Sequence, residues 1–149
     1  MARYNTIFAG PVQKTMPHTL EREMDADTAP GTLVTIDANN EFIPHATQGA
    51  RGSFFILSEN TLEQQNAEDN VLAGRTGIGF YPQLDCFYHV LVETATNMTA
   101  EITQLTSNGS GVLEVATVGD EILFIAAETF NNTTGSNQLV LVRPYQGGI

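Results

Sequence analysis

The feature that most constrains this chain is a series of short apolar runs, each closed by a cluster of turn-forming residues. Clear examples are residues 32–36, 54–57, 86–93 and 121–128, which are bounded by Asn, Asp, Gly and Ser. Runs of this length that are rich in β-branched and aromatic residues predict strands. Because no long amphipathic helical pattern competes with them, the chain predicts a mostly β fold, built as a small barrel or sandwich.

Local patterns add detail to this expectation. Residues 32–36 and 41–44 flank the turn cluster 37–40, which predicts a hairpin. Residues 54–57 are apolar at every position, which predicts a strand buried on both faces. Alternation in 86–93 puts Cys86, Tyr88, Val90 and Val92 on one face and Phe87, His89, Leu91 and Glu93 on the other. Further strands are expected at 100–106, 112–116 and 138–145.

The first 29 residues have a different character. Prolines follow Gly10, Met16 and Ala29, and each proline biases the preceding residue towards extended conformations. Residues 20–24 could form one helical turn, which is too short to be stable alone. We therefore divide the chain into an extended N-terminal arm, residues 1–29, and a β domain, residues 30–149.

The arm contains more apolar side chains than a purely solvating tail needs. This pattern predicts that the arm binds a partner surface and becomes ordered there. The alternative is a disordered tail, or a strand that the segment adds to its own domain. The expected partner-binding residues are Arg3, Tyr4, Ile7, Phe8, Val12, Met16, Leu20 and Met24.

Charge excludes one large class of partner. The chain has 17 acidic residues against six Lys and Arg, for a net charge of −11, and Lys14 is its single lysine. Nucleic-acid binding requires clustered basic residues, so we expect no nucleic-acid partner. No segment approaches the ~20 apolar residues of a membrane helix. The N-terminus lacks the apolar centre of a signal peptide, so we expect no membrane partner and synthesis in the cytoplasm.

Motifs for chemistry are missing from the sequence. His18, His45 and His89 match no metal-ligand spacing, and no Gly-x-Ser-x-Gly elbow occurs. The glycines of residues 71–81 lack a dinucleotide-binding context and indicate turns or a bulge. Cys86 lies in an apolar run, which favours a buried thiol. We expect no catalytic activity and no bound metal or cofactor. The sequence alone does not exclude a Ser-His-Asp triad built from residues that are far apart in the chain.

Residues 30–37, Pro-Gly-Thr-Leu-Val-Thr-Ile-Asp, and the returning run 40–44 resemble the opening strands of a known family. This family is the small head-decoration, or cement, proteins of tailed bacteriophages. The similarity is one of patterning and covers about residues 30–145. Further runs that resemble the family are 54–57, 107–113, 119–128 and 139–145.

The resemblance implies a compact β domain, often called a β-tulip, that assembles as a homotrimer. It implies a place on the outer surface of the virion, where trimers bind the major capsid protein and help the shell resist internal DNA pressure. An N-terminal arm would then lie across capsid subunits. The family has no catalytic residues, so none is carried over to this chain. Residues 1–29 and 58–70 have no counterpart in the family pattern.

Three other functions remain as alternatives. The chain could be a structural component of a tail or fibre, a sugar- or receptor-binding β module, or a small trimeric β enzyme. A binding module of the sugar type would expose aromatic side chains in its loops, and an enzyme would need a pocket with converging polar groups. A decoration protein would bind capsid shells and raise their melting temperature.

Overall fold

The computed structural model describes residues 3–11 and 18–148 and confirms a mostly β fold. Its one helical element, among the described residues, is the 3₁₀ turn η1 at Thr61–Glu63. The strands are β1 Phe8–Gly10, β2 Thr19–Glu23, β3 Leu33–Ile36, β4 Phe42–Pro44, β5 Phe55–Leu57, β6 Thr76–Phe80, β7 Phe87–Val92, β8 Asn97–Met98, β9 Gln104–Ser107, β10 Leu113–Val115, β11 Glu121–Ala126, β12 Phe130–Asn131 and β13 Gln138–Gly148.

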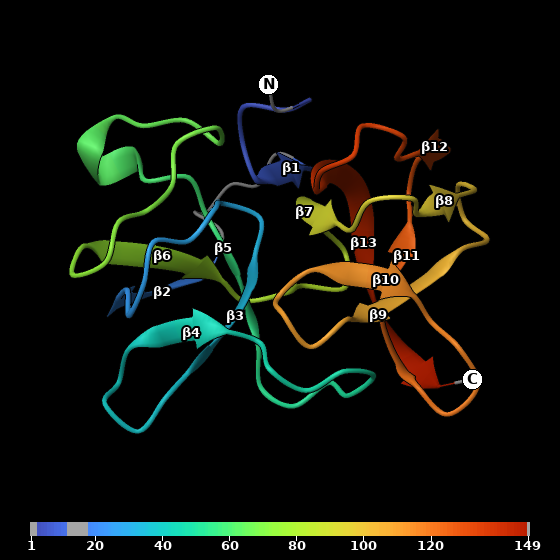
Figure 1. The fold of residues 1–149 in the computed structure, drawn as a ribbon, viewed down its shortest axis with the longest axis horizontal. Helices are drawn as coiled ribbons and strands as arrows, with labels where there is room; N and C mark the ends of the chain where they lie inside the picture. The colour runs from blue at the N-terminus through green and yellow to red at the C-terminus, as the bar shows by residue number, and fades with distance from the viewer. Residues whose placement is uncertain (1–2, 12–17, 149) are drawn as a thin grey trace.

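Five strands close a small barrel, seen on the right of Figure 1. The pairing runs from β7 to β10, then to β9, β11 and β13, and β13 pairs back with β7. Only the contact between β7 and β10 is parallel. Closure leaves no free edge within this ring of strands. Strand β1 adds to β7 beside the ring, with Phe8 opposite Tyr88.

The other five strands form an antiparallel sheet of order β2-β6-β5-β3-β4, which we call the second lobe. The sheet curls strongly, because Met24, just after β2, bridges to Phe42 in β4. Strands β3 and β4 form the expected hairpin. The side chain of Asp37 holds its turn by accepting the N–H groups of Asn39 and Glu41 at 2.8 and 3.0 Å.

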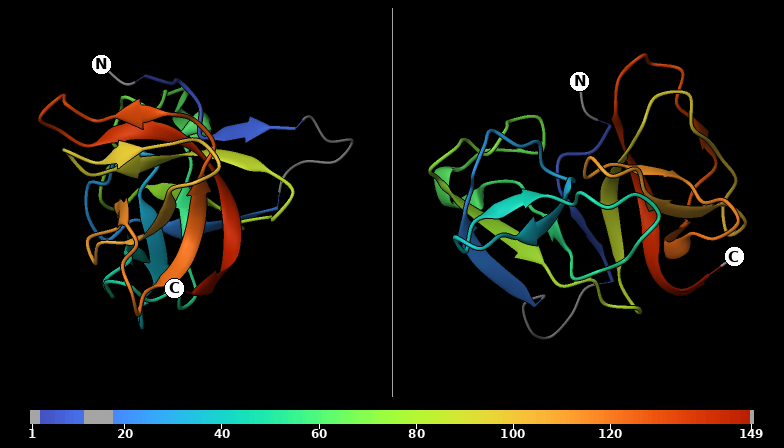
Figure 2. Two further views of the ribbon diagram at one scale, coloured as in Figure 1. Left: turned by 90° about the vertical axis from the view of Figure 1, so that its right-hand side faces the viewer. Right: turned by 60° about the horizontal axis from the view of Figure 1, so that its bottom comes forward.

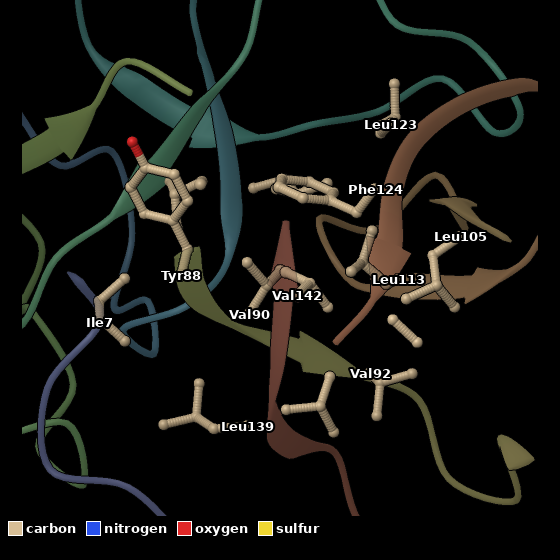
Figure 3. Close-up of a cluster of buried hydrophobic side chains, with 14 of the residues drawn as sticks. Ile7, Tyr88, Val90, Val92, Leu105, Leu113, Leu123, Phe124, Leu139 and Val142 are labelled. Atoms are coloured by element: carbon tan, nitrogen blue, oxygen red, sulfur yellow. The ribbon is translucent and has the colours of Figure 1, made fainter. Parts of the chain in front are cut away.

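Strand β5 is the shared wall between the barrel and the second lobe. Ile56 lies in the large apolar cluster that fills the barrel, whereas Phe55 and Leu57 lie in the smaller cluster inside the second lobe. The strand is therefore buried on both faces, as its composition predicts. Figure 3 shows the barrel part of the large cluster, formed by Val90, Val92, Leu105, Leu113, Phe124 and Val142 among others.

Two glycines in β6 explain how the second lobe packs so tightly. A Cβ atom on Gly79 would lie 2.8 Å from Cζ of Phe42, and one on Gly77 would overlap Sδ of Met24. The sequence-based interpretation of these glycines as turn or bulge residues is therefore wrong. They belong to a regular strand, where the missing side chain makes room for Met24 and Phe42. Gly74 does lie in a turn, with φ of 78°.

The described part of residues 1–29 belongs to the folded body. Strand β1 pairs with β7, and β2 pairs with β6 through five residue pairs. Residues 20–24 are thus strand-like rather than a helical turn, and the proposed boundary at 29/30 separates no independent arm in the described residues. Figure 2 shows the N-terminal segment, residues 3–11, running along the junction between the two lobes.

Candidate functional site

The first two expected partner-binding residues contact the chain's own barrel. The guanidinium of Arg3 pairs with Glu128 and lies 3.9 Å from the centroid of the Phe130 ring. The Tyr4 hydroxyl donates to the same Glu128 carboxylate. The Tyr4 ring stacks on His89 with centroids 3.7 Å apart. These contacts fix residues 3 and 4 onto the end of the barrel.

Ile7 and Phe8 continue this attachment. Ile7 is fully buried in the large cluster, and Figure 3 shows it among the side chains of that cluster. Its N–H donates to Glu59 at 2.9 Å, and its carbonyl accepts the N–H of His89 at 2.7 Å. Phe8 is half-buried against the same cluster. The expectation that Ile7 is available to a partner is therefore wrong, because the side chain belongs to the core.

The remaining expected residues fall into two groups. Leu20 and Met24 pack in the second lobe, Leu20 half-buried and Met24 with 1% of its surface exposed. Val12 and Met16 lie outside the described residues. Where the structure describes the segment, the alternative of strands added to the chain's own domain is the correct one. The physical reason is that a fitting apolar pocket is already present within the same molecule.

His89 lies in the middle of β7, on the face opposite the core residues Tyr88 and Val90. Its Nδ1–H donates to the carbonyl of Thr6 at 2.7 Å. Burial lowers the pKa of His89, with a further contribution from Arg3, and outweighs the opposing effects of the Thr6 carbonyl, Glu128 and Glu59. Together with the stacked Tyr4 ring, these contacts account for the imidazole without any ligand.

A Ser–His pair exists that sequence spacing could not reveal. His45 Nδ1 accepts from the Ser107 hydroxyl at 2.9 Å, and its Nε2–H donates to the carbonyl of Arg51 at 2.8 Å. Ser107 is fully buried, and its oxygen also accepts the N–H of Gly109 at 3.2 Å. A catalytic nucleophile must be accessible to its substrate, whereas the Ser107 hydroxyl is buried away from solvent. The pair ties the loop after β4 to β9.

Across residues 3–11 and 18–148, no three His, Cys, Asp or Glu side chains converge in a way that could hold a metal ion. Within the same residues, no helix has both the length and the apolar character that crossing a bilayer requires.

A groove lies where the second lobe extends beyond the barrel. In β2 and β6, Thr19 pairs with Phe80 and Glu21 with Ile78, so these four side chains share one sheet face. Phe80 and its other neighbour, Ile56, are covered by the barrel. Beyond Phe80 the barrel no longer covers this sheet face, and a pocket of about 360 Å³ is open to solvent there.

Two further segments complete the walls of this groove. Phe8 of β1 lines the barrel side, and residues 58–62 line the opposite side with Leu62, whose surface is 60% exposed. Glu21 and Glu59 are the charged side chains that line it. Sequence reasoning missed this site, although Leu62 was a usable signal as the one large apolar residue in the polar run 58–70.

Large apolar side chains are exposed at several places on the surface. Four of them belong to the barrel: Ile102 and Val118 lie in turns, 72% and 88% exposed, and Val115 in β10 and Tyr145 in β13 are 43% and 36% exposed. The other four come from residues 62–84, which connect the strands of the second lobe and lead into the barrel. They are Leu62, Leu72, Tyr81 and Leu84, each more than two-fifths exposed.

Every arginine is bonded within the chain. Arg3, Arg75 and Arg143 pair with Glu128, Glu63 and Glu101. Arg22 donates to the carbonyl of Glu21, and Arg51 donates to the carbonyls of Ile122 and Tyr145. All five guanidinium groups thus have bonds within the chain, and its 17 acidic residues outnumber its six Lys and Arg.

No protein-family model matches this chain, and no curated protein matches it either.

Proposed function

We propose that this protein is a capsid decoration, or cement, protein of a tailed bacteriophage. In this role it binds the outer surface of the shell formed by the major capsid protein, as a homotrimer, and stabilises that shell against internal DNA pressure. It acts through binding alone and performs no reaction.

The observation that best supports this proposal is the exposure of large apolar side chains on a strongly acidic body. Leu62, Leu72, Tyr81 and Leu84 are accessible between residues 62 and 84. Exposed apolar side chains in one stretch of the chain are candidates for an interaction surface. A net charge of −11 keeps free copies apart until a partner is met. Both properties suit a protein that must stay dispersed and then attach to a large surface.

The build of the molecule also supports a mechanical role. One apolar cluster extends from the barrel across β5 to the second lobe, so the two lobes share a core. A shared core resists relative motion of the lobes, because separating them would expose its apolar surface to water. A rigid protein that binds two shell subunits transmits force between them, whereas a protein of two lobes joined by a flexible linker would not.

The structure changes which residues we propose for shell contact. The described apolar residues of the expected arm are packed on the chain's own body, as shown by Ile7 and Met24. We therefore place the shell contact on the exposed side of the second lobe and on its groove. The resemblance of residues 30–145 to decoration proteins is the reason for naming a capsid shell as the partner.

Co-sedimentation tests this proposal directly. The purified chain is mixed with expanded and unexpanded shells of tailed bacteriophages, and the melting of the shells is followed by calorimetry. We expect saturable binding to expanded shells and a higher melting temperature for the shell. Saturation at three copies per site, and trimers in sedimentation velocity of protein released from shells, would support the homotrimer. Shells that melt unchanged at saturating protein would contradict the function, and only monomers after release would contradict the trimer.

A further inference from the structure

The groove between β1, β6 and residues 58–62 has the walls of a binding site. Phe8, Phe80, Ile78 and Leu62 supply apolar surface from three separate parts of the chain. Of these, Phe80 is nearly buried, Phe8 and Ile78 are half-buried and Leu62 is open to solvent. Buried apolar side chains at the bottom of a pocket, with one exposed apolar side chain at its rim, are typical of a site that receives a side chain from another molecule.

The size of the groove limits its occupant. Its volume of about 360 Å³ is near the lower end of the ~300–1,000 Å³ range of ligand pockets. This volume suits a few side chains of an extended or helical segment. The walls come from β1, β2, β6 and residues 58–62, whose backbone is held by strand pairing or by the turn at η1, so the pocket exists before its occupant arrives.

Charge then selects the chemistry of that occupant. Glu21 and Glu59 both line the groove, and the described lining residues include no cation. Glu59 Oε2 already accepts the N–H of Ile7, while the Glu21 side chain is exposed on β2. Arg22, the next residue, lies on the opposite face of the strand because side chains alternate. A segment with Lys or Arg beside its apolar side chain would be attracted here, and an acidic one would be repelled.

We propose that this groove binds a segment of a partner protein that presents a large apolar side chain flanked by Lys or Arg. The apolar side chain enters between Leu62, Ile78 and Phe8, and the basic residue faces Glu21. That the partner is a capsid subunit rests on the proposed function, whereas the chemistry of the groove follows from its own residues.

A pair of synthetic peptides tests the groove in isolation. One is an acetylated pentapeptide of alternating lysine and leucine, and the other has glutamate in place of lysine. Heteronuclear NMR of the full chain should show shifts at the amides of Leu62 and Ile78, with the lysine peptide binding at least about tenfold more tightly. Raising the salt from about 50 to about 500 mM should weaken it several-fold, since exposed charges are screened.

Matched variants locate the contact on the chain. Leu62→Ser should weaken the lysine peptide about tenfold, because it removes one side of the apolar pocket. Ile102→Ser removes an apolar side chain of comparable exposure, 72% against 60% for Leu62, from a barrel turn and should leave the affinity unchanged. Glu21→Gln should weaken the lysine peptide a few-fold and reduce its salt dependence. Equal binding of both peptides, equal effects of the two Ser variants, or no binding by the wild-type chain would each overturn the proposal.

Shell binding by Leu62→Ser separates this inference from the proposed function. A several-fold loss of shell affinity in the variant supports both. Full shell affinity in the variant overturns the groove as the shell contact and leaves the function standing. Peptide binding at the groove by a wild-type chain that binds no shell supports the groove and contradicts the function.

Discussion

Replacing Ile7 by alanine is the sharpest test of whether the N-terminal segment belongs to the fold. In the structure Ile7 is fully buried, with its backbone bonded to Glu59 and His89. Removing three carbons from a buried side chain loses about 2.4 kcal/mol of transfer free energy, at ~0.8 kcal/mol for each methylene. The cavity that remains adds to this, and comparable core substitutions cost ~2–5 kcal/mol. We expect a loss of about 3 kcal/mol in the free energy of unfolding.

The chain offers a control of the same chemistry. Ile102→Ala makes the identical change at a side chain that is 72% exposed in the turn before β9. Surface substitutions of this kind change stability by about 0.5 kcal/mol or less. Urea unfolding of wild type and both variants, followed by far-ultraviolet circular dichroism, measures the difference. A loss of about 3 kcal/mol corresponds to a drop of roughly 6–12 °C in the melting temperature of a domain of this size.

Amide exchange adds a local readout to this experiment. The N–H of His89 donates to the Ile7 carbonyl, and that of Ala67 donates to the Asn5 carbonyl. Both amides should exchange faster in Ile7→Ala, because the segment that protects them is held less tightly. If Ile7→Ala and Ile102→Ala cost the same small amount and these two amides keep wild-type exchange, then the segment is not part of the core and our reasoning fails.

Three further predictions follow from individual side chains. Burial raises the pKa of Tyr88 to about 12, whereas a tyrosine in the unfolded chain titrates near pH ~10. As the pH rises, the Tyr88 hydroxyl therefore loses its proton in the unfolded chain first, and the free energy of unfolding falls between about pH 10 and 12. Urea unfolding across that window should show a loss of about 2–3 kcal/mol that Tyr88→Phe removes; parallel curves for the two proteins would contradict this. Burial lowers the pKa of His89, so protonation of the unfolded chain should reduce stability as the pH falls below about 6.5. In His89→Gln the stability change from pH 7.5 to 5.5 should be smaller than in wild type, and an equal change would argue against this role. Gly79→Ala places a Cβ 2.8 Å from Phe42 and 3.0 Å from Phe55. We expect this crowding to lower the free energy of unfolding by about 1–3 kcal/mol, measured by calorimetry, and an unchanged melting temperature would contradict it.

Much of the fold could be predicted because strand signals are local. The run 54–57 is apolar throughout and forms β5, and the turn cluster 37–40 joins β3 and β4 as expected. In 86–93 the alternation correctly groups Tyr88, Val90 and Val92 on one face, which the structure shows to be the buried one. Strand period and turn chemistry depend on neighbouring residues only, so they can be read from the sequence.

Other elements were missed where their stability comes from distant residues. The expected strand at 100–106 begins only at Gln104, because residues 99–103 form a turn held by the Thr103 hydroxyl accepting the Thr99 N–H at 2.8 Å. Strand β6 contains Gly77 and Gly79, which weaken any local strand signal. Their place in the sheet is explained only by the bulk of Met24 and Phe42 across the lobe.

The same division applies to the candidate site. Sequence identified the apolar residues of the first 29 positions but could not say whether their partner was another protein or the chain's own core. The groove joins Phe8, Glu21, Leu62 and Ile78, which are far apart in sequence and share no motif. Composition shows an acidic chain, and the pattern of short apolar runs and turn clusters predicts that it is rich in strands. Which strands close the barrel, which surface stays open and where the N-terminal segment lies were decided only by tertiary packing, since burial depends on what the rest of the chain places opposite each side chain.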